Sequence, residues 1–491
     1  MKAVFDNING TCSIEGTIPS GLVCDYDAMS QELRVVRDKI GEKSLYYAQL
    51  PTSAVVATDL KDILPHIAYP EINMLNLAQP IRYNFPIDLR QTWIEQIKRI
   101  RAGEELMIDQ NGIRSRIYWK RDHTPTFKGT KQEALTEALR LLRKSVKECI
   151  DTSDGPVAVL LSGGIDSTSL AALTKEIQQE VHVISAGYRG NNYTACDERP
   201  EARRFAEEKG LIYHEVELDV NDFQTYLDEV IPYLDEPCFD VNCMVQYALY
   251  KSAAKLGFKT ILCGLGGDEQ FYSYTPENEL VSLFKKLNQF TALYPARKHK
   301  KDYISFVCCN LKFLLWPTDM AKMIVRNPVS WTYDDYTKFA KDATLIDNGQ
   351  LIEFKDIDVD FRFSHNVDIN QMYDYMFSTF ANTLCVYMAN RMSAANGIEV
   401  RYPLLNAELV QFMDSIPLDM KFDAKQPKRF QKEMMVGIVP DYILYAKKRG
   451  FTPPFEFIWQ ICRAYKYKRI HSSNVFFNSM MADRIIDNLL K

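Results

Sequence analysis

The stretch that decides the fold is Leu160-Leu161-Ser162-Gly163-Gly164-Ile165-Asp166-Ser167. It joins the apolar run Val157–Leu161, which is typical of a buried strand, directly to a segment that we expect to be a helix. A loop in that position collects free backbone N–H groups at the positive end of the helix dipole, and its two glycines let a phosphate come close to the backbone. No Gly-Lys-Ser or Gly-Lys-Thr follows, so the loop is not a Walker A loop.

This first loop predicts a pyrophosphate-binding site. Ser162 and Ser167 can donate hydroxyl protons, and Asp166 can reach a magnesium ion on the phosphates. The alternative is a plain tight turn in which Asp166 or Ser167 caps the helix. On the pyrophosphate interpretation, the nucleotide-binding residues are Leu161, Ser162, Gly163, Gly164, Asp166 and Ser167.

A second glycine-rich turn repeats the arrangement. The apolar run 260–263 ends in Gly264-Leu265-Gly266-Gly267-Asp268-Glu269. In a parallel sheet both turns lie at the carboxyl ends of strands, the edge at which such sheets bind ligands. We therefore expect Asp166 and Asp268 to share one magnesium ion, unless Asp268 merely caps the next helix. The nucleotide-binding residues expected in this turn are Gly264, Gly266 and Gly267.

Strands and helices alternate through the middle of the chain. Largely apolar strands that alternate with helices indicate an α/β fold, with a parallel sheet covered by helices on both faces. The expected strands are Val157–Leu161, Val181–Ala186, Ile212–Leu218 and Lys259–Cys263, and the expected helices are Lys131–Ile150, Ser167–Gln179, Glu201–Lys209 and Val245–Leu256.

The two ends of the chain differ from this middle part. Short β-branched and aromatic runs separated by turn signals predict a small β-rich domain over residues 1–125. We expect a second domain over 126–491 that ends in a helical part, with its clearest helical pattern at Met372–Asn396. The sequence gives no residue-level account of 275–370. The strands expected near the N-terminus are Leu45–Leu50, Ala54–Ala57, Glu105–Ile108 and Ile113–Trp119.

The composition of the 491 residues excludes several classes of protein. A formal net charge of −5 gives no basic footprint for nucleic acid. The 11 cysteines form no CxxC pair, which is typical of reduced thiols and not of a disulfide framework or a zinc site. The N-terminus has no apolar signal region, and the longest apolar candidate, Tyr303–Trp316, is interrupted by Asn310 and Lys312. We expect a cytoplasmic protein with neither nucleic-acid nor membrane partners.

Several further segments, with the two loops, resemble the asparagine synthetase superfamily of pyrophosphate-loop (PP-loop) enzymes. In order and spacing they cover roughly residues 155–455. The segments are Asp197-Glu198 with Ala202 and Ala206, Asp235-Glu236-Pro237 with Asp240, the run Arg391–Leu405, Pro427-Lys428-Arg429, and Lys448-Arg449-Gly450-Phe451.

The resemblance implies ATP-dependent amide formation. In that family a substrate carboxylate attacks the α-phosphate of ATP, magnesium pyrophosphate leaves, and an amine captures the acyl-adenylate. Lys448 occupies the family's catalytic lysine position, where a cation can stabilise developing charge, and the resemblance places Asp268 with it as a catalytic residue. The alternative for Lys448 is an ordinary solvated lysine in a basic cluster. Glu399 and Arg401 are expected to form a structural ion pair that supports the site.

The N-terminal segment resembles a shortened form of the family's N-terminal-nucleophile glutaminase domain. Lys43–Ala48 and Ile100–Glu104 match short pieces of it. The family's glutaminase needs a cysteine directly after the initiator, whereas this chain has Lys2. Cys12 and Cys24 are expected to be core thiols, so glutamine hydrolysis is not expected.

Loss of glutamine hydrolysis is typical of β-lactam synthetases and lasso-peptide cyclases. The first carry a tyrosine base after the first glycine of the second turn and a partner glutamate. Here these positions hold Leu265 and, nearby, Cys385, which count against β-lactam formation. We therefore favour a lasso-peptide-cyclase-like ligase in peptide or natural-product maturation, with a leader-peptide-processing protein as a candidate partner.

Other functions remain open on the sequence. An asparagine synthetase that uses ammonia or a separate glutaminase subunit would form asparagine from aspartate. A scaffold without catalysis would cleave no ATP, although Ser162, Asp166, Asp268 and Lys448 argue against it. Sulfur transfer or tRNA modification on the same loop is weakened by the pI of 5.9 and the lack of paired cysteines. The sequence names neither the amine, the carboxylate, the base for amide formation nor the oligomeric state.

Overall fold

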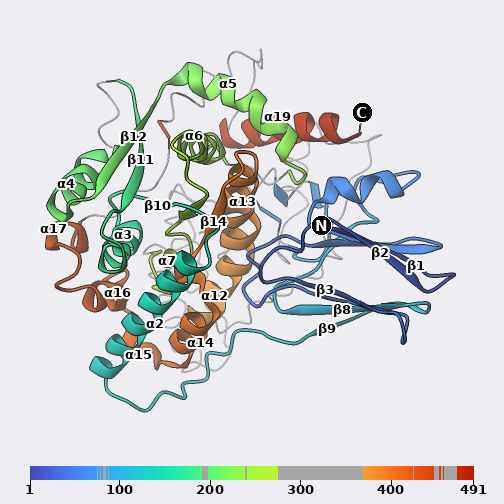
Figure 1. Ribbon diagram of the computed structural model, residues 1–491, viewed down its shortest axis with the longest axis horizontal. Coiled ribbons are helices and arrows are strands. Elements are labelled where there is room, and N and C mark those ends of the chain that lie inside the picture. The colour runs from blue at the N-terminus through green and yellow to red at the C-terminus, as the bar shows by residue number, and fades with distance from the viewer. Residues whose placement is uncertain are drawn as a thin grey trace, which may run out of the picture.

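The structure is a computed structural model, and it contains a β-rich N-terminal part beside an α/β part (Figure 1). It describes residues 1–73, 76–77, 79–80, 85–86, 88–190, 197–237, 240–274, 369–423, 425–446, 453–454, 457 and 473–490. Lys448 and almost all of the stretch 275–370 therefore lie outside the described residues.

Two antiparallel sheets form the N-terminal part. Their strand orders are β2-β1-β6-β5-β7 and β3-β4-β8-β9. The strands are β1 (Lys2–Asp6), β2 (Thr11–Glu15), β3 (Val23–Asp27), β4 (Glu32–Val36), β5 (Tyr46–Gln49), β6 (Ser53–Ala57), β7 (Lys98–Arg99), β8 (Glu104–Asp109) and β9 (Gly112–Ile117).

Alternating side chains hold these two sheets together. Successive side chains of a strand point to opposite faces, so every second residue enters the layer between the sheets. Ala3 and Phe5 of β1 and Val35 of β4 belong to one fully buried cluster that also contains Leu106 and Ile108 of β8. The predicted β-rich domain is confirmed as a fold. The expected strands correspond to β5, β6, β8 and β9, and the sequence analysis missed β1 to β4 and the two-residue β7.

The α/β part is built on a five-stranded sheet in the order β12-β11-β10-β13-β14. All four neighbouring pairs are parallel, which confirms the predicted parallel sheet. Its strands are β10 (Val157–Leu160), β11 (His182–Tyr188), β12 (Ile212–Leu218), β13 (Thr260–Leu262) and β14 (Glu399–Arg401). The sequence analysis did not predict β14.

Helices cover both faces of this sheet, as predicted. Ala158, Ile261 and Val400 point into one apolar cluster with α6 and α13. Their neighbours Val159 and Leu262 point into the other cluster, with α2 and α3. The helices are α2 (Lys131–Asp151), α3 (Ile165–Ile177), α4 (Arg199–Lys209), α5 (Val220–Val230), α6 (Asn242–Lys255) and α7 (Gly267–Gln270).

The remaining described chain is mainly helical. The helix predicted over 372–396 is present as α12, a π-helical segment over Phe377–Val386 and α13 in direct succession. The C-terminal helix α19 packs against both parts, because Met481 joins the sheet cluster and Ala482 the N-terminal cluster. The helices are α12 (Ile369–Met376), α13 (Tyr387–Ala394), α14 (Ala407–Ser415), α15 (Leu418–Lys421), α16 (Arg429–Met434), α17 (Asp441–Leu444) and α19 (Ser473–Leu490).

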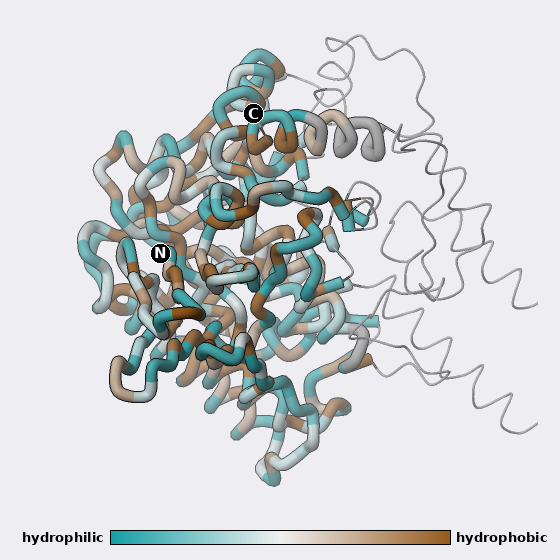
Figure 2. Tube along the Cα trace, turned by 90° about the vertical axis from the view of Figure 1, so that its right-hand side faces the viewer, coloured by the Kyte–Doolittle hydropathy of each residue, from teal (hydrophilic) through white to brown (hydrophobic). Residues whose placement is uncertain are grey.

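Hydrophobic and hydrophilic segments alternate along the whole described trace (Figure 2). Among the residues that the structure describes, no helix is long and apolar enough to cross a membrane.

Candidate active site

The two glycine-rich loops meet at the carboxyl edge of the parallel sheet. β10 pairs directly with β13, with Val157 opposite Thr260 and Val159 opposite Leu262. The loop after each strand therefore emerges beside the other, as the sequence analysis expected.

The first loop is shaped by its own hydroxyl groups. Ser167 Oγ accepts a hydrogen bond from Ser162 N at 3.0 Å and donates one to Gly164 O at 3.2 Å. Ser162 Oγ accepts from Gly164 N at 3.2 Å. Gly163 has φ +86°, and a Cβ there would lie 2.9 Å from Glu198 O, so only glycine fits. Ser162 and Ser167 thus fix the loop in a conformation that leaves no room for a side chain at Gly163.

Neither aspartate caps the helix that follows its loop. Helix α3 has Gly164 as its N-cap and α7 has Gly266, and neither helix start has a side-chain cap hydrogen bond. The capping alternatives for Asp166, Ser167 and Asp268 are therefore wrong. The unbonded N–H groups of the first turn of α3 remain available to an anion.

Glycines also allow the two loops to touch. A Cβ on Gly264 would lie 3.0 Å from Asp166 Cβ, and a Cβ on Gly267 would overlap the Asp166 carboxylate. Gly266, at φ +90°, lies against Leu405 in the same way. Any side chain at these positions would push the second loop away from Asp166.

Lys428 lies between the two predicted magnesium ligands. Its Nζ is in direct contact with Asp166 Oδ2 and lies 2.7 Å from Asp268 Oδ1. The residue is 6% exposed and is the N-cap of α16, at φ +57°. Burial alone would lower the pKa of Lys428, but the two carboxylates outweigh it and raise the pKa above its ordinary value. The sequence analysis placed Lys428 in a family segment but did not assign it to the site.

The residues present fit a divalent cation held between protein and phosphate. Asp166 Oδ1 is buried, and within the described residues it has no hydrogen-bond partner. No group of three or more histidine, cysteine or acidic side chains gathers anywhere in the described part. A magnesium ion on Asp166 and Asp268 would therefore complete its coordination with phosphate oxygens and water, which is its usual behaviour.

A tyrosine–glutamate pair follows the second loop. The Tyr274 hydroxyl donates to Glu269, and the Tyr274 backbone N–H donates to Tyr373 Oη at 2.9 Å. Burial and the neighbouring charges of Glu269 and Asp268 raise the pKa of Tyr274 well above its ordinary value. The sequence analysis looked for such a pair at Leu265 and Cys385 and missed this one.

The other predicted residues are structural. Arg401 pairs with Glu399 at 2.9 Å, as expected, and also binds Thr152 O at 2.9 Å. Asp197 pairs with Arg199 at the start of α4. Cys24 is buried in the core, as expected, whereas Cys12 is only partly buried against the same cluster. Burial raises the pKa of both thiols to about 11, which keeps them protonated.

Asp235 and Glu236 join the two parts of the molecule. Asp235 Oδ2 accepts from Leu60 N at 2.7 Å, and its two oxygens each lie 2.8 Å from Arg391. Arg99 holds Glu236 with two hydrogen bonds of 2.9 and 2.8 Å. Asp235 and Glu236 therefore contribute to the interface between the two parts.

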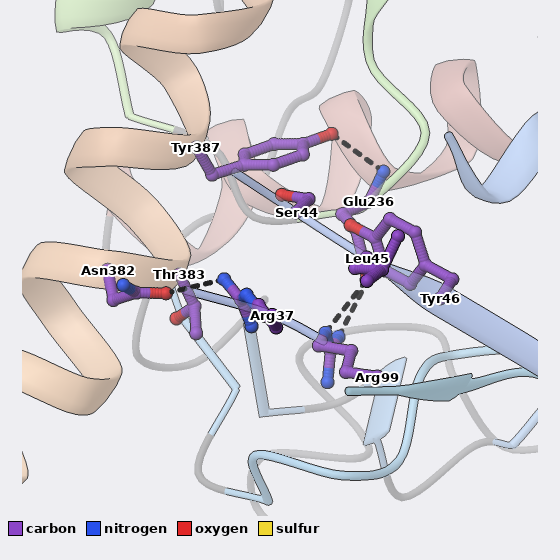
Figure 3. Close-up of a pocket in the computed structure, with 9 residues that line it drawn as sticks. All are labelled: Arg37, Ser44, Leu45, Tyr46, Arg99, Glu236, Asn382, Thr383 and Tyr387. Atoms are coloured by element: carbon purple, nitrogen blue, oxygen red, sulfur yellow. Dashed lines mark hydrogen bonds and ion pairs between the residues drawn. The ribbon is translucent and has the colours of Figure 1, made fainter. Parts of the chain in front are cut away.

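A small pocket opens at the same interface (Figure 3). Arg37, on its wall, donates to Ile100 O at 2.7 Å and to Asn382 Oδ1 at 3.0 Å, so its charge is held by neutral oxygens. Two further lining residues, Arg99 and Glu236, are joined to each other by the hydrogen bonds described above. The lining residues are Arg37, Ser44, Leu45, Tyr46, Arg99, Glu236, Asn382, Thr383 and Tyr387.

Fold and site define a class: an ATP-dependent carbon–nitrogen ligase with a pyrophosphate loop. The family profile "Asparagine synthase" matches residues 137–490, and "Glutamine amidotransferase domain" matches residues 22–119. The chain belongs to the asparagine synthase family.

Relatives with known names are distant. An amidase of Gibberella zeae (Amidase chry2) is 25% identical over 478 residues, covering 88% of this chain and 69% of the relative. Amidase chyE of Penicillium rubens is 25% identical over 477 residues, with the same 88% and 69% coverage. Asparagine synthetase [glutamine-hydrolyzing] 1 of Bacillus subtilis is 24% identical over 442 residues, covering 85% of this chain and 65% of that protein. The chain thus spans about two thirds of the length of these relatives.

Proposed function

We propose that this protein adenylates a substrate carboxylate with ATP and couples it to an amine without hydrolysing glutamine. The observation that carries the proposal is the meeting of the two loops, with Asp166, Asp268 and Lys428 converging at the carboxyl edge of the sheet. The proposal divides the chain into a domain over 1–125 without glutaminase activity and a ligase domain over 126–491.

Each part of the site has a role in this reaction. The loop Leu161–Ser167 binds the pyrophosphate portion of ATP through backbone N–H groups, and Gly264, Gly266 and Gly267 bring the second loop against it. Asp166 and Asp268 would hold magnesium, which neutralises the pyrophosphate as it leaves. Lys428, and Lys448 by resemblance, supply positive charge where negative charge develops.

Independence from glutamine is supported by the N-terminal part. Its first 125 residues contain only two cysteines, Cys12 and Cys24, and neither is next to the N-terminus. Lys2 lies in strand β1 and pairs with Glu15 at 3.2 Å, and the Met1 amine donates to Thr58 Oγ1 at 3.1 Å. Burial raises the pKa of both thiols, which supports an amine source other than glutamine.

The amine and the carboxylate that we favour belong to a peptide or a natural product, as in lasso-peptide cyclases, with a leader-peptide-processing protein as a partner. Leu265 packs partly buried against the apolar cluster and cannot accept a proton, which counts against β-lactam formation. A second candidate is ammonia-dependent asparagine synthesis, because named relatives are asparagine synthetases. A cytoplasmic location is part of the same proposal.

One assay separates the two candidates. The purified protein is supplied with ATP, magnesium, aspartate and ammonium, and AMP, pyrophosphate and asparagine are measured together. Stoichiometric asparagine identifies the second candidate and rejects the peptide ligase. Pyrophosphate release without asparagine, abolished by Asp166→Ala, supports adenylation of another carboxylate. If no carboxylate in a panel of amino acids and peptides triggers pyrophosphate release, the proposed function is wrong and a scaffold role replaces it.

A further inference from the structure

The contact of Lys428 with two carboxylates raises a question about charge. Asp166 and Asp268 approach each other because Gly264 and Gly267 carry no side chain to separate the loops. Two carboxylates held this close repel each other unless a cation lies between them. In the structure that cation is Lys428, which is almost completely buried.

The backbone conformation at the start of α16 positions Lys428 between the two carboxylates. The residue has a left-handed backbone, with φ +57°, and directly precedes α16. Its carbonyl accepts the Lys432 N–H at 2.9 Å, which ties it into the helix. Lys432 itself is only partly buried, and its pKa is lowered by burial and by the charge of Lys428. Lys428, at the N-cap of α16, therefore differs from Lys432, within the helix: Lys428 is the one that contacts the two carboxylates.

The same carboxylates are those that fit magnesium. Lys428 covers Asp166 Oδ2 and Asp268 Oδ1, while Asp166 Oδ1 has no partner among the described residues. A divalent cation that bound both aspartates would have to share or displace the lysine, because two cations on one carboxylate pair repel each other.

We propose that Lys428 is the resident cation of the nucleotide-free site, and that it competes with divalent metal for Asp166 and Asp268. The lysine keeps the two loops together when the site holds no metal. It also makes metal binding weak until a nucleotide supplies the additional negative charge. This inference rests on the part of the proposed function that assigns the two aspartates to the metal.

Manganese binding to the nucleotide-free protein tests the competition. Free Mn²⁺ is followed by electron paramagnetic resonance during titration of wild type, Lys428→Gln, and the matched control Lys432→Gln. We expect Lys428→Gln to bind Mn²⁺ about tenfold tighter or more, on the scale of one close charge interaction. Lys432→Gln should stay within about twofold of wild type. Adding Asp166→Asn to Lys428→Gln should remove the gain.

Two results would overturn the inference. One is equal Mn²⁺ affinity of Lys428→Gln and wild type; the other is a gain that survives Asp166→Asn. If Lys428→Gln does not fold in the absence of metal, Mn²⁺ should restore its folding as judged by circular dichroism. Loss of folding that Mn²⁺ does not restore would make Lys428 purely structural and reject the competition. None of these readouts needs ATP turnover, so failure of the proposed function would be seen separately.

Discussion

Two acid pairs in this protein come from segments shared with the family and have opposite surroundings. Asp235 and Glu236, at the interface, are 0% and 2% exposed. The side chains of Asp166 and Asp268, at the loop edge, are 22% and 31% exposed. The first pair is held by backbone N–H groups, a tyrosine hydroxyl and two arginines, whereas both members of the second pair lie against Lys428. An acid pair whose carboxylate oxygens all have hydrogen-bond donors in the protein stabilises the fold. An acid pair with a buried oxygen that lacks such a donor is suited to bind a ligand.

The hydrogen bonds make this comparison concrete. Tyr387 Oη donates to Asp235 Oδ1 at 3.0 Å and accepts the backbone N–H groups of Asp235 and Glu236 at 3.0 and 2.9 Å. Arginine from each part of the molecule completes the cluster. At the loop edge, by contrast, Asp166 Oδ1 is buried without such a donor in the described part of the chain.

The largest loss of stability should come from removing one acid of the interface pair, Asp235 and Glu236. Asp235→Ala leaves Arg391 with a buried charge that has lost a main partner, and we expect a loss of about 3–5 kcal/mol in the free energy of unfolding. Urea denaturation measures the loss. The exposed Asp151→Ala, which breaks the surface pair with Lys147, is the matched control and should change stability by less than about 0.5 kcal/mol. If Asp235→Ala and Asp151→Ala lose similar amounts of unfolding free energy, the interface pair does not stabilise the fold in the way proposed.

Asp166 and Asp268, which we call the reactive pair, should affect pyrophosphate release more than stability. Asp166→Asn keeps the size of the side chain and removes one metal ligand, so we expect pyrophosphate release to fall by about 10²–10³-fold, as for loss of one electrostatic stabiliser. The free energy of unfolding should fall by less than in Asp235→Ala, because Asp268 still lies 2.7 Å from the buried Lys428. A large stability loss without loss of pyrophosphate release would place Asp166 with the interface pair.

A third buried acid, Glu269, sharpens the comparison. Tyr274→Phe removes the hydroxyl that donates to it, and we expect a stability loss of about 1–3 kcal/mol because a buried carboxylate loses a donor. Pyrophosphate release should be retained, since the hydroxyl is not on the nucleotide loops. Thermal denaturation and the pyrophosphate assay, run on the same sample, separate the two effects. Loss of pyrophosphate release in a stable variant would assign Glu269 to the reactive pair instead.

The smallest effect is expected at the N-terminal thiols. Cys12→Ser should leave amide formation within about twofold of wild type and stability within about 0.5 kcal/mol, because the thiol stays protonated and partly exposed. Initial rates with and without glutamine provide the measurement. A glutamine-dependent rate that disappears in Cys12→Ser would show that the N-terminal part is reactive after all.

The two pairs also differ in what sequence reasoning can predict. The loop edge was predictable because apolar strands followed by glycine turns are local patterns, and parallel pairing then brings β10 and β13 together. Strands β2 and β3 were missed because most of their side chains are exposed. Strand β14 was missed because two of its three residues, Glu399 and Arg401, are charged, so it lacks the apolar run that marks β13.

Contacts between segments far apart in the sequence could not be predicted from local sequence patterns. Lys428 is 262 positions from Asp166, and Glu236 is 137 positions from Arg99. No spacing rule links such residues, so both the site lysine and the role of the interface acids required the tertiary structure. The predicted catalytic residue Lys448 and the region 275–368 lie outside the described residues and stay predictions.

The distance along the chain between Asp166 and Lys428 also sets an order of events during synthesis. A ribosome adds roughly 5–20 residues per second, so the 262 positions that separate the partners take on the order of tens of seconds to make. Once residue 268 has been added, the growing chain carries both aspartates without their lysine, and the two loops cannot yet be held together by it. The first four strands of the sheet can pair before Lys428 is made, but the ligand-binding edge is complete only after that residue has been added, so a nascent chain that stops before residue 428 leaves the edge unfinished.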